Sequence, residues 1–377
     1  MIIKLKALMK RLLTIIFLSV FLFCQTAHAE EAPYVGVWSG NIGQHKVQVC
    51  FASDSQYFYL TKKQGITLYV PEKASKNWQE WQERIRNPKT YSWETPAIWI
   101  ISSIDKKILK GTWVNQTTQQ SLPIALKKLA VVKQLGDSAN PYFQCGDEFY
   151  KPIVQAIQYT YKQEKIGDKT LKAIKTKAGE AFEYPSNLKN ANKVNAFITG
   201  WLEGQTISAY ECELNGGSGY QRYIEPVFWT LDWMVIKDIL PDTYCGGAHG
   251  GSDSLYLTFD LNSGKLIDTS RWLKNFKKAN SSFSNDENGQ HLAIGFAKLI
   301  ERSFINNDDP VQNCKDSLDF MGLRNPYPDK NGLNFYASFA HAIRQCDTVI
   351  SIPYKEIAPY LTATGKKAVK SILLTKQ

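Results

Sequence analysis

Residues 254–265 have the sequence Ser254-Leu-Tyr-Leu-Thr-Phe-Asp-Leu261-Asn262-Ser-Gly-Lys265. Hydrophobic and polar positions alternate up to Leu261, which is the period of a half-buried β-strand, and the Asn-Ser-Gly that follows is typical of a turn. Helical spacing appears before this strand, between Asn192 and Glu211, and after it, between His291 and Ile305. Further strands are predicted at 333–339 and 348–352. Because helices and strands interleave, residues 190–377 are predicted to form an α+β domain.

The preceding part of the chain, residues 30–130, is predicted to be an antiparallel β domain, either a barrel or a sandwich. Short runs rich in β-branched and aromatic residues follow one another closely, as in Lys46-Val-Gln-Val-Cys50-Phe. The start Val35-Gly-Val-Trp38-Ser-Gly is similar in general build to lipocalin-sized barrels. Asn77 to Arg86 has helical character instead. Residues 131–189 are polar and rich in lysine, and we expect them to connect the two domains.

Residues 1–29 have the three features of a cleavable signal peptide. Basic residues without an acid come first, Leu12 to Phe23 form an apolar run, and Ala27-His-Ala29 supplies small residues for cleavage. The apolar run is too short to span a bilayer, which takes roughly 20 residues. We therefore predict cleavage after Ala29, a mature chain without a transmembrane segment, and a periplasmic or secreted location.

The charge of the mature chain excludes one class of partner. Residues 1–29 contain four basic residues and no acidic ones, so their removal lowers the formal net charge from +10 to +6. This mild excess suits an anionic envelope polymer, and it also suits plain solubility. No concentrated basic stripe with interleaved aromatic residues is present, so nucleic acid is not an expected partner.

Six of the seven cysteines remain after cleavage, because Cys24 leaves with the signal. An even number in an oxidising compartment indicates three disulfides. Six cysteines allow 15 pairings, and closeness along the chain favours Cys212–Cys245, Cys314–Cys346 and Cys50–Cys145. No Cys-x-x-Cys pair is present, which argues against redox catalysis and against a zinc ribbon.

Two stretches of the second half carry a family resemblance. Tyr244-Cys-Gly-Gly-Ala-His-Gly250, the strand up to Leu261 and Gly264-Lys265 resemble the "GGAH…FDLxTGK" signature of RsiV-like extracytoplasmic domains. Ile352-Pro-Tyr-Lys-Glu-Ile-Ala-Pro-Tyr-Leu361 resembles the closing run of the same family. The resemblance covers roughly residues 190–362 and leaves 30–189 uncovered. It implies a binding module of the bacterial cell envelope, with lysozyme as one kind of ligand.

The glycine-rich segment within this signature is the candidate ligand site. Its glycines permit close backbone approach, and successive amides in such a loop can bind an anion. We take Gly246, Gly247, His249 and Tyr256 as the candidate ligand-binding residues. The competing interpretation is a tight connection that His249 holds by hydrogen bonds.

Catalytic and metal chemistry find less support in the sequence. His249 with Asp253, Asp260 or Asp268 could supply a base and an orienting acid, but no nucleophile motif is present. The mature histidines lack metal-ligand spacing, so neither a metal nor another cofactor is expected. Three glutamates lie among tryptophans, which suits either sugar chemistry or amphipathic packing on the outside of the β domain. These glutamates are Glu80, Glu83 and Glu94.

The sequence therefore predicts an exported binding protein without enzymatic activity. Its ligand would be an envelope glycan or a secreted protein such as lysozyme. Lysozymes are usually basic, and like charges slow association, so the net charge of +6 weighs mildly against that partner. One alternative function is a cell-wall hydrolase that uses His249 with nearby acids. Another is a purely structural envelope protein, which the absence of a pocket or an exposed aromatic patch would favour.

Overall fold

The computed structural model describes most of the chain. The described residues are 33–70, 79–87, 90, 92–135, 142–166, 169–217, 219–245, 250–274, 276, 294–305, 314, 322–339 and 341–374. The signal-peptide prediction for residues 1–29 lies outside them, as do Gly246, Gly247 and His249. No helix within these ranges is both long and apolar enough to cross a membrane.

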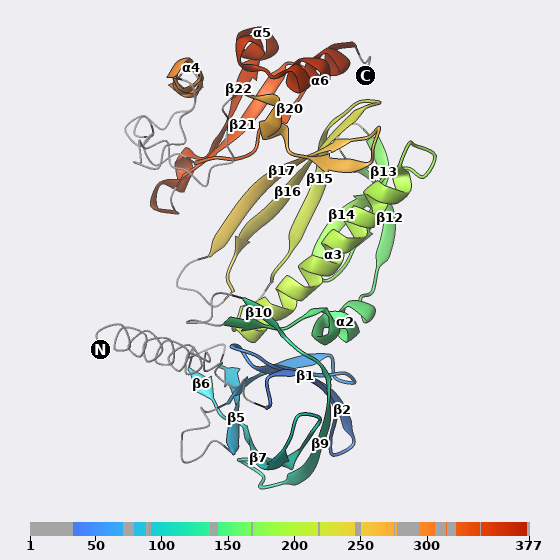
Figure 1. Ribbon diagram of the computed structural model, residues 1–377, viewed down its shortest axis with the longest axis vertical. Coiled ribbons are helices and arrows are strands. Elements are labelled where there is room, and N and C mark those ends of the chain that lie inside the picture. Colours follow the sequence, from blue (N-terminus) through green and yellow to red (C-terminus); the bar gives the residue numbers. More distant parts are fainter. Residues whose placement is uncertain are drawn as a thin grey trace, which may run out of the picture. The chain divides into compact units, whose positions relative to one another are not determined.

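The chain divides into two compact units. One contains Met1–Arg84 with Thr95–Phe149, and the other contains Ile85–Glu94 with Tyr150–Gln377. The first unit is built around a barrel, in which each of eight strands pairs antiparallel with its neighbours and β4–β5 and β1–β9 pairings close the ring (Figure 1). Of the two expected architectures, the structure adopts the barrel. Its strands are β1 Gly36–Ile42, β2 His45–Phe51, β3 Gln56–Tyr59, β4 Gln64–Tyr69, β5 Glu80–Arg86, β7 Ala97–Ile104, β8 Ile108–Asn115 and β9 Ser121–Ala130.

The barrel interior is filled by aromatic and branched side chains. Trp38, Trp81 and Trp99 are fully buried, and Phe51 packs edge-on against Trp81 with ring centroids 4.9 Å apart. An eight-stranded barrel is just wide enough for side chains to fill it. The alternation of the strands therefore buries one face of each strand in a single aromatic core. Short elements outside the ring are β6 Trp93–Glu94, β10 Lys133–Leu135, β11 Tyr142–Gln144 and α2 Asp147–Gln155.

The second unit contains a seven-stranded sheet whose strands follow one another in sequence order. All pairings are antiparallel except β14 with β15, which is parallel because helix α3, Ala191–Leu214, lies between these strands in the chain. The strands are β12 Thr160–Ile166, β13 Lys169–Lys175, β14 Gly179–Glu183, β15 Arg222–Trp229, β16 Trp233–Thr243, β17 Gly251–Asp260 and β18 Lys265–Ile267. The predicted strand at 254–261 is thus the greater part of β17.

Neighbouring residues of β16 pack into different layers. Met234 and Ile236 join Val194 and Ile198 of α3 in one hydrophobic cluster, whereas Val235 belongs to a second cluster formed by the C-terminal elements. Because successive side chains of a strand point to opposite faces, the sheet has α3 on one face and the C-terminal layer on the other. Figure 1 shows α3 running along the sheet.

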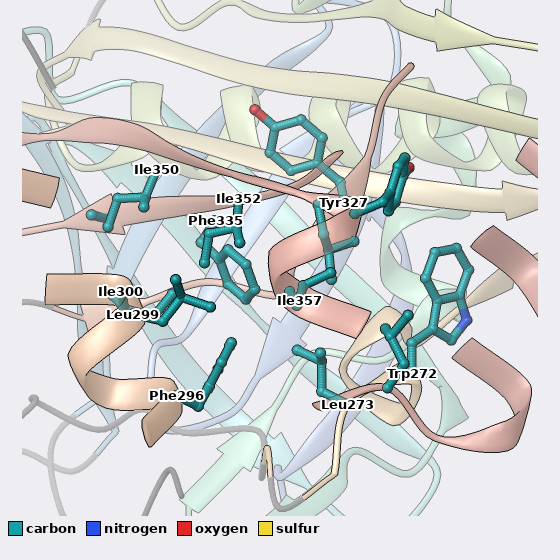
Figure 2. Close-up of a cluster of buried hydrophobic side chains, with 14 of the residues drawn as sticks. Trp272, Leu273, Phe296, Leu299, Ile300, Tyr327, Phe335, Ile350, Ile352 and Ile357 are labelled. Atoms are coloured by element: carbon teal, nitrogen blue, oxygen red, sulfur yellow. The ribbon is translucent and has the colours of Figure 1, made fainter. Parts of the chain in front are cut away.

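The C-terminal layer is a small sheet with short helices around it. Its centre is β21, Gly332–Ser338, which pairs along its length with β22, Thr348–Pro353. Figure 2 shows how Phe296, Leu299 and Ile300 of α4, Ile294–Ile305, meet Phe335 and Ile352 of this sheet. The remaining elements are β19 Gly322–Leu323, β20 Tyr327–Pro328, η1 Thr269–Trp272, η3 His341–Cys346, α5 Tyr354–Ile357, η4 Ala358–Tyr360 and α6 Ala363–Leu374.

Three disulfides join Cys50 to Cys145, Cys212 to Cys245 and Cys314 to Cys346. These are the pairs expected from closeness along the chain. Two other expectations differ from the structure. The segment 77–86, expected to be helical, contributes β5, and the supposed connecting region 131–189 contains β12 to β14, which belong to the large sheet.

Candidate functional site

The predicted glycine-rich site is bounded by two fixed ends. Before it, Cys245 is bonded to Cys212 near the end of α3, and after it, Gly251 pairs with Thr243 in the β16–β17 ladder. Residues 246–249, which include Gly246, Gly247 and His249, lie outside the described part of the chain. Their role as ligand contacts therefore stays a prediction.

Tyr256, the fourth predicted contact, is engaged inside the protein. Its ring stacks on Tyr327 with centroids 3.8 Å apart and an angle of 5° between planes, and Tyr336 lies at 6.1 Å. Lys237, its partner across the β16–β17 ladder, places its ammonium 5.8 Å from the same ring. Since Tyr327 already covers one face of the ring, the arrangement supports the packing of the sheet.

The three acids named for the hydrolase alternative all have structural partners. Asp253 forms an ion pair with Arg324 at 3.4 Å. Asp260 accepts hydrogen bonds from the backbone N–H of Asn262 and from the hydroxyl of Ser263, and Asp268 caps η1. The contacts of Asp260 and Asp268 are the usual ones of turns and helix starts. The hydroxyls that reach Asp260 and Asp268 come from Ser263 and Ser270, which are two or three residues away in the same turn.

Among the three glutamates, only Glu83 enters the barrel. Its side chain is 3% exposed, and its Oε1 accepts three hydrogen bonds, from Tyr57 Oη at 2.5 Å, Trp99 Nε1 at 3.0 Å and Trp113 Nε1 at 2.5 Å. Glu80 is half-exposed, and Glu94 is exposed and accepts a bond from Asn87. The carboxylate pair that glycoside hydrolysis needs is therefore not assembled from these residues, and the expectation that they pack outside the barrel is wrong for Glu83.

Burial dominates the electrostatics of this carboxyl group. Loss of water raises the pKa of Glu83 from its ordinary value of 4.5, while the hydrogen bonds from Tyr57, Trp99 and Trp113 act in the opposite direction. Desolvation disfavours the charged form of an acid, and donors favour it. The folded barrel consequently holds a proton on Glu83 at a pH where the unfolded chain has lost it.

Because of this pKa shift, Glu83 should make its own pH-dependent contribution to the free energy of unfolding. Because the pKa is raised in the folded state, the contribution is fully present below about pH 4.5 and is lost as the pH rises through the folded pKa. Compared with Glu83→Gln, the native chain should become progressively less stable as the pH rises above about 4.5 and through the raised pKa of Glu83. Urea unfolding of both proteins, followed by hydrogen exchange in barrel peptides, measures the difference. A difference that is constant with pH would contradict the assignment.

An open cleft of about 970 Å³ lies in the C-terminal layer of the second unit. One wall is α4, and the opposite wall is formed by the end of β22, α5 and η4. The charged residues of its lining are Lys298, Arg302 and Glu356, and Ser303 and Ser351 add hydroxyl groups. Such a volume is in the range of small-molecule sites, and its polar lining suits a hydrophilic ligand.

The charged residues of the cleft are unequally engaged. Arg302 Nη2 contacts Glu356 Oε2, which links α4 to α5, whereas Lys298 forms no ion pair with any residue in the described ranges. Lys298 and Arg302 are four positions apart on α4, so they lie on the same side of the helix. The described part of the lining therefore carries two positive charges and one negative charge.

The η4 part of the cleft wall is held in place by packing and backbone contacts. The Tyr360 ring lies 5.2 Å from Phe296, and Lys274 donates from its backbone N–H to the Tyr360 carbonyl and from its ammonium to the Pro359 carbonyl. A Cβ atom on Gly295 would lie 2.8 Å from Tyr360 Oη, so glycine is what lets this tyrosine approach α4. The cleft thus offers a fixed aromatic edge beside its cations.

The cleft was not predicted from the sequence, because the prediction for residues 291–305 rests only on the apolar positions of that helix. Leu299 and Ile300 predict which side of that helix is buried. The signal for the site was on the polar side, where Lys298 and Arg302 repeat with the helical period. Glu356 comes from a distant segment, and no local pattern links it to them.

Comparisons with known proteins find matches among solved structures. No protein-family model matches the chain, and no curated protein matches it. A solved structure to which it is similar is a DUF3298 family protein from Pseudomonas aeruginosa PAO1. The two are 13% identical, the alignment covers 59% of this chain and 95% of that one, and the TM-score is 0.35. A similarity of this size assigns no function to this chain.

Proposed function

We propose that this protein is an extracytoplasmic binding protein without enzymatic activity, and that its C-terminal cleft holds a carboxylated glycan of the bacterial cell envelope. Three disulfides support a location outside the reducing cytoplasm. The predicted signal peptide agrees with that location. The observation that carries the ligand class is Lys298, a cation with no ion-pair partner among the described residues, beside Arg302 in an open polar cleft.

The chemistry of the lining matches a sugar acid. Ammonium and guanidinium groups bind carboxylates through charge-assisted hydrogen bonds, and Arg302 has donors that Glu356 does not use. The hydroxyls of Ser303 and Ser351 suit sugar hydroxyl groups, and Tyr360 with Pro353 and Pro359 gives flat apolar surface for a ring. A basic protein ligand such as lysozyme suits this lining less well, because the cleft has a net positive charge.

Removing the cations should weaken binding of a muramyl glycan. We expect Arg302→Ala to lower the affinity for soluble glycan strands of alternating N-acetylglucosamine and N-acetylmuramic acid about tenfold, the equivalent of one charge-assisted hydrogen bond. Lys298→Ala should act in the same direction. Isothermal titration calorimetry on the mature chain measures both affinities.

A matched control separates the cleft from overall charge. Lys367 is an exposed lysine on α6 that does not line the cleft, so Lys367→Ala removes the same charge elsewhere. Its affinity should stay within about twofold of the native value, since exposed charges are screened by salt. Equal losses in Lys298→Ala and Lys367→Ala would argue for nonspecific attraction and against a site in the cleft.

A further inference from the structure

We infer that Glu356 is a specificity-determining residue of the cleft. The cations Lys298 and Arg302 favour an acidic sugar over a neutral one, and Glu356 makes the cleft select a sugar with a single negative charge over a doubly charged phosphosugar. This inference rests on the proposed function and adds the charge class of the ligand. The observation behind it is that Glu356, an acid, lines a cleft whose other described charged residues are cations. Glu356 forms an ion pair with one of them, Arg302.

The charges of the lining limit how much negative charge a ligand can carry. Arg302 and Glu356 form an ion pair across the cleft, so Lys298 is left as the charge that no acid among the described residues balances. A ligand with one carboxylate can lie near Lys298 and the remaining N–H groups of Arg302, because Glu356 contacts the guanidinium through Nη2. One negative charge on the ligand then leaves the cleft neutral.

A second negative charge on the ligand meets a different environment. No further cation lines the cleft among the residues that the structure describes, and the excess charge would lie near the carboxylate of Glu356. Like charges a few ångströms apart repel, more strongly in a partly enclosed site than in bulk water. Glu356 is 42% exposed and Arg302 61%, so solvent reduces this repulsion without removing it. Selectivity through such a repulsive element is a common device of binding sites.

Three sugars of closely similar ring and different charge test the inference. At about pH 7.5, N-acetylglucosamine is neutral, N-acetylmuramic acid has one negative charge, and N-acetylglucosamine 6-phosphate has close to two, since a phosphate ester has its second pKa near 6. The native mature chain should bind N-acetylmuramic acid most tightly. Dissociation constants come from NMR titration, which measures millimolar affinities.

Removing the charge of Glu356 should change this order. In Glu356→Gln the amide oxygen still accepts a bond from Arg302, but the repulsion is gone. We expect the affinity for the phosphosugar to rise about tenfold, for N-acetylmuramic acid about threefold or less, and for the neutral sugar not at all. Glu301→Gln is the matched control, because Glu301 is an exposed acid of α4 that does not line the cleft. It should leave all three affinities unchanged.

The possible outcomes distinguish a failure of this inference from a failure of the proposed function. If the native chain binds N-acetylmuramic acid and Lys298→Ala weakens that binding, the sugar binds in the cleft. The inference is then overturned if the native chain binds the phosphosugar more tightly than N-acetylmuramic acid. It is also overturned if Glu356→Gln raises the affinities for both acidic sugars by the same factor. If no acidic sugar binds, or if Lys298→Ala has no effect, the proposed function itself fails and the selectivity with it.

Discussion

Glu83→Ala should destabilise the barrel by about 3–5 kcal/mol, because it leaves three buried donors without an acceptor. The hydroxyl of Tyr57 and the indole N–H groups of Trp99 and Trp113 all donate to Glu83 Oε1. An unsatisfied buried polar group costs about 1–3 kcal/mol, and the missing side chain also leaves a cavity in an aromatic core. Urea denaturation at about pH 7, with hydrogen exchange resolved to barrel peptides, measures the loss.

Glu83→Gln is the control for that experiment. Its amide oxygen can accept bonds from the same donors, and it carries no charge that burial would penalise. Its free energy of unfolding should lie within about 1 kcal/mol of the native value. Should Glu83→Ala unfold at the same urea concentration as the native chain, the three hydrogen bonds do not hold the barrel together.

Glu83 also explains why one element of the barrel was mispredicted. In β5 the inward positions are Trp81 and Glu83, so the alternation is present, but one of its buried members is an acid. A pattern search counts glutamate as polar and as a good helix former. The strand was hidden because its inward residue is satisfied by partners from β3, β7 and β8, and only the assembled barrel supplies these.

The lysine-rich strands of the second unit were missed for a related reason. β12 and β13 lie at the end of the large sheet and present ion pairs such as Lys175 with Glu164, at 3.1 Å. Charged side chains are usual on edge strands, where they discourage further pairing. The available signal was Gly167-Asp168 between two segments of similar length, a dipeptide typical of hairpin turns. By contrast, strands with a conventional apolar face, such as β17 and β21, were predicted.

We expect Gly40 to be as important for the stability of the barrel as Glu83. Gly40 pairs with Leu126, and a Cβ atom added to it would lie 2.0 Å from the carbonyl oxygen of Ala125 and 2.8 Å from Leu126 Cα. Both atoms belong to the backbone of β9, which closes the ring against β1, so no side-chain rotation relieves the overlap. Glycines in barrel strands commonly mark such close approaches.

We therefore expect Gly40→Val to lower the free energy of unfolding by at least about 3 kcal/mol, the upper end of the range for overpacking. Ser39→Val is the control on the same strand. Ser39 is only half-buried, and valine favours strands, so this change should alter stability by less than about 0.5 kcal/mol. Urea midpoints of the two variants make the comparison. Similar losses in both would mean that β1 tolerates no valine in general, and that the approach of β9 to Gly40 is not the cause.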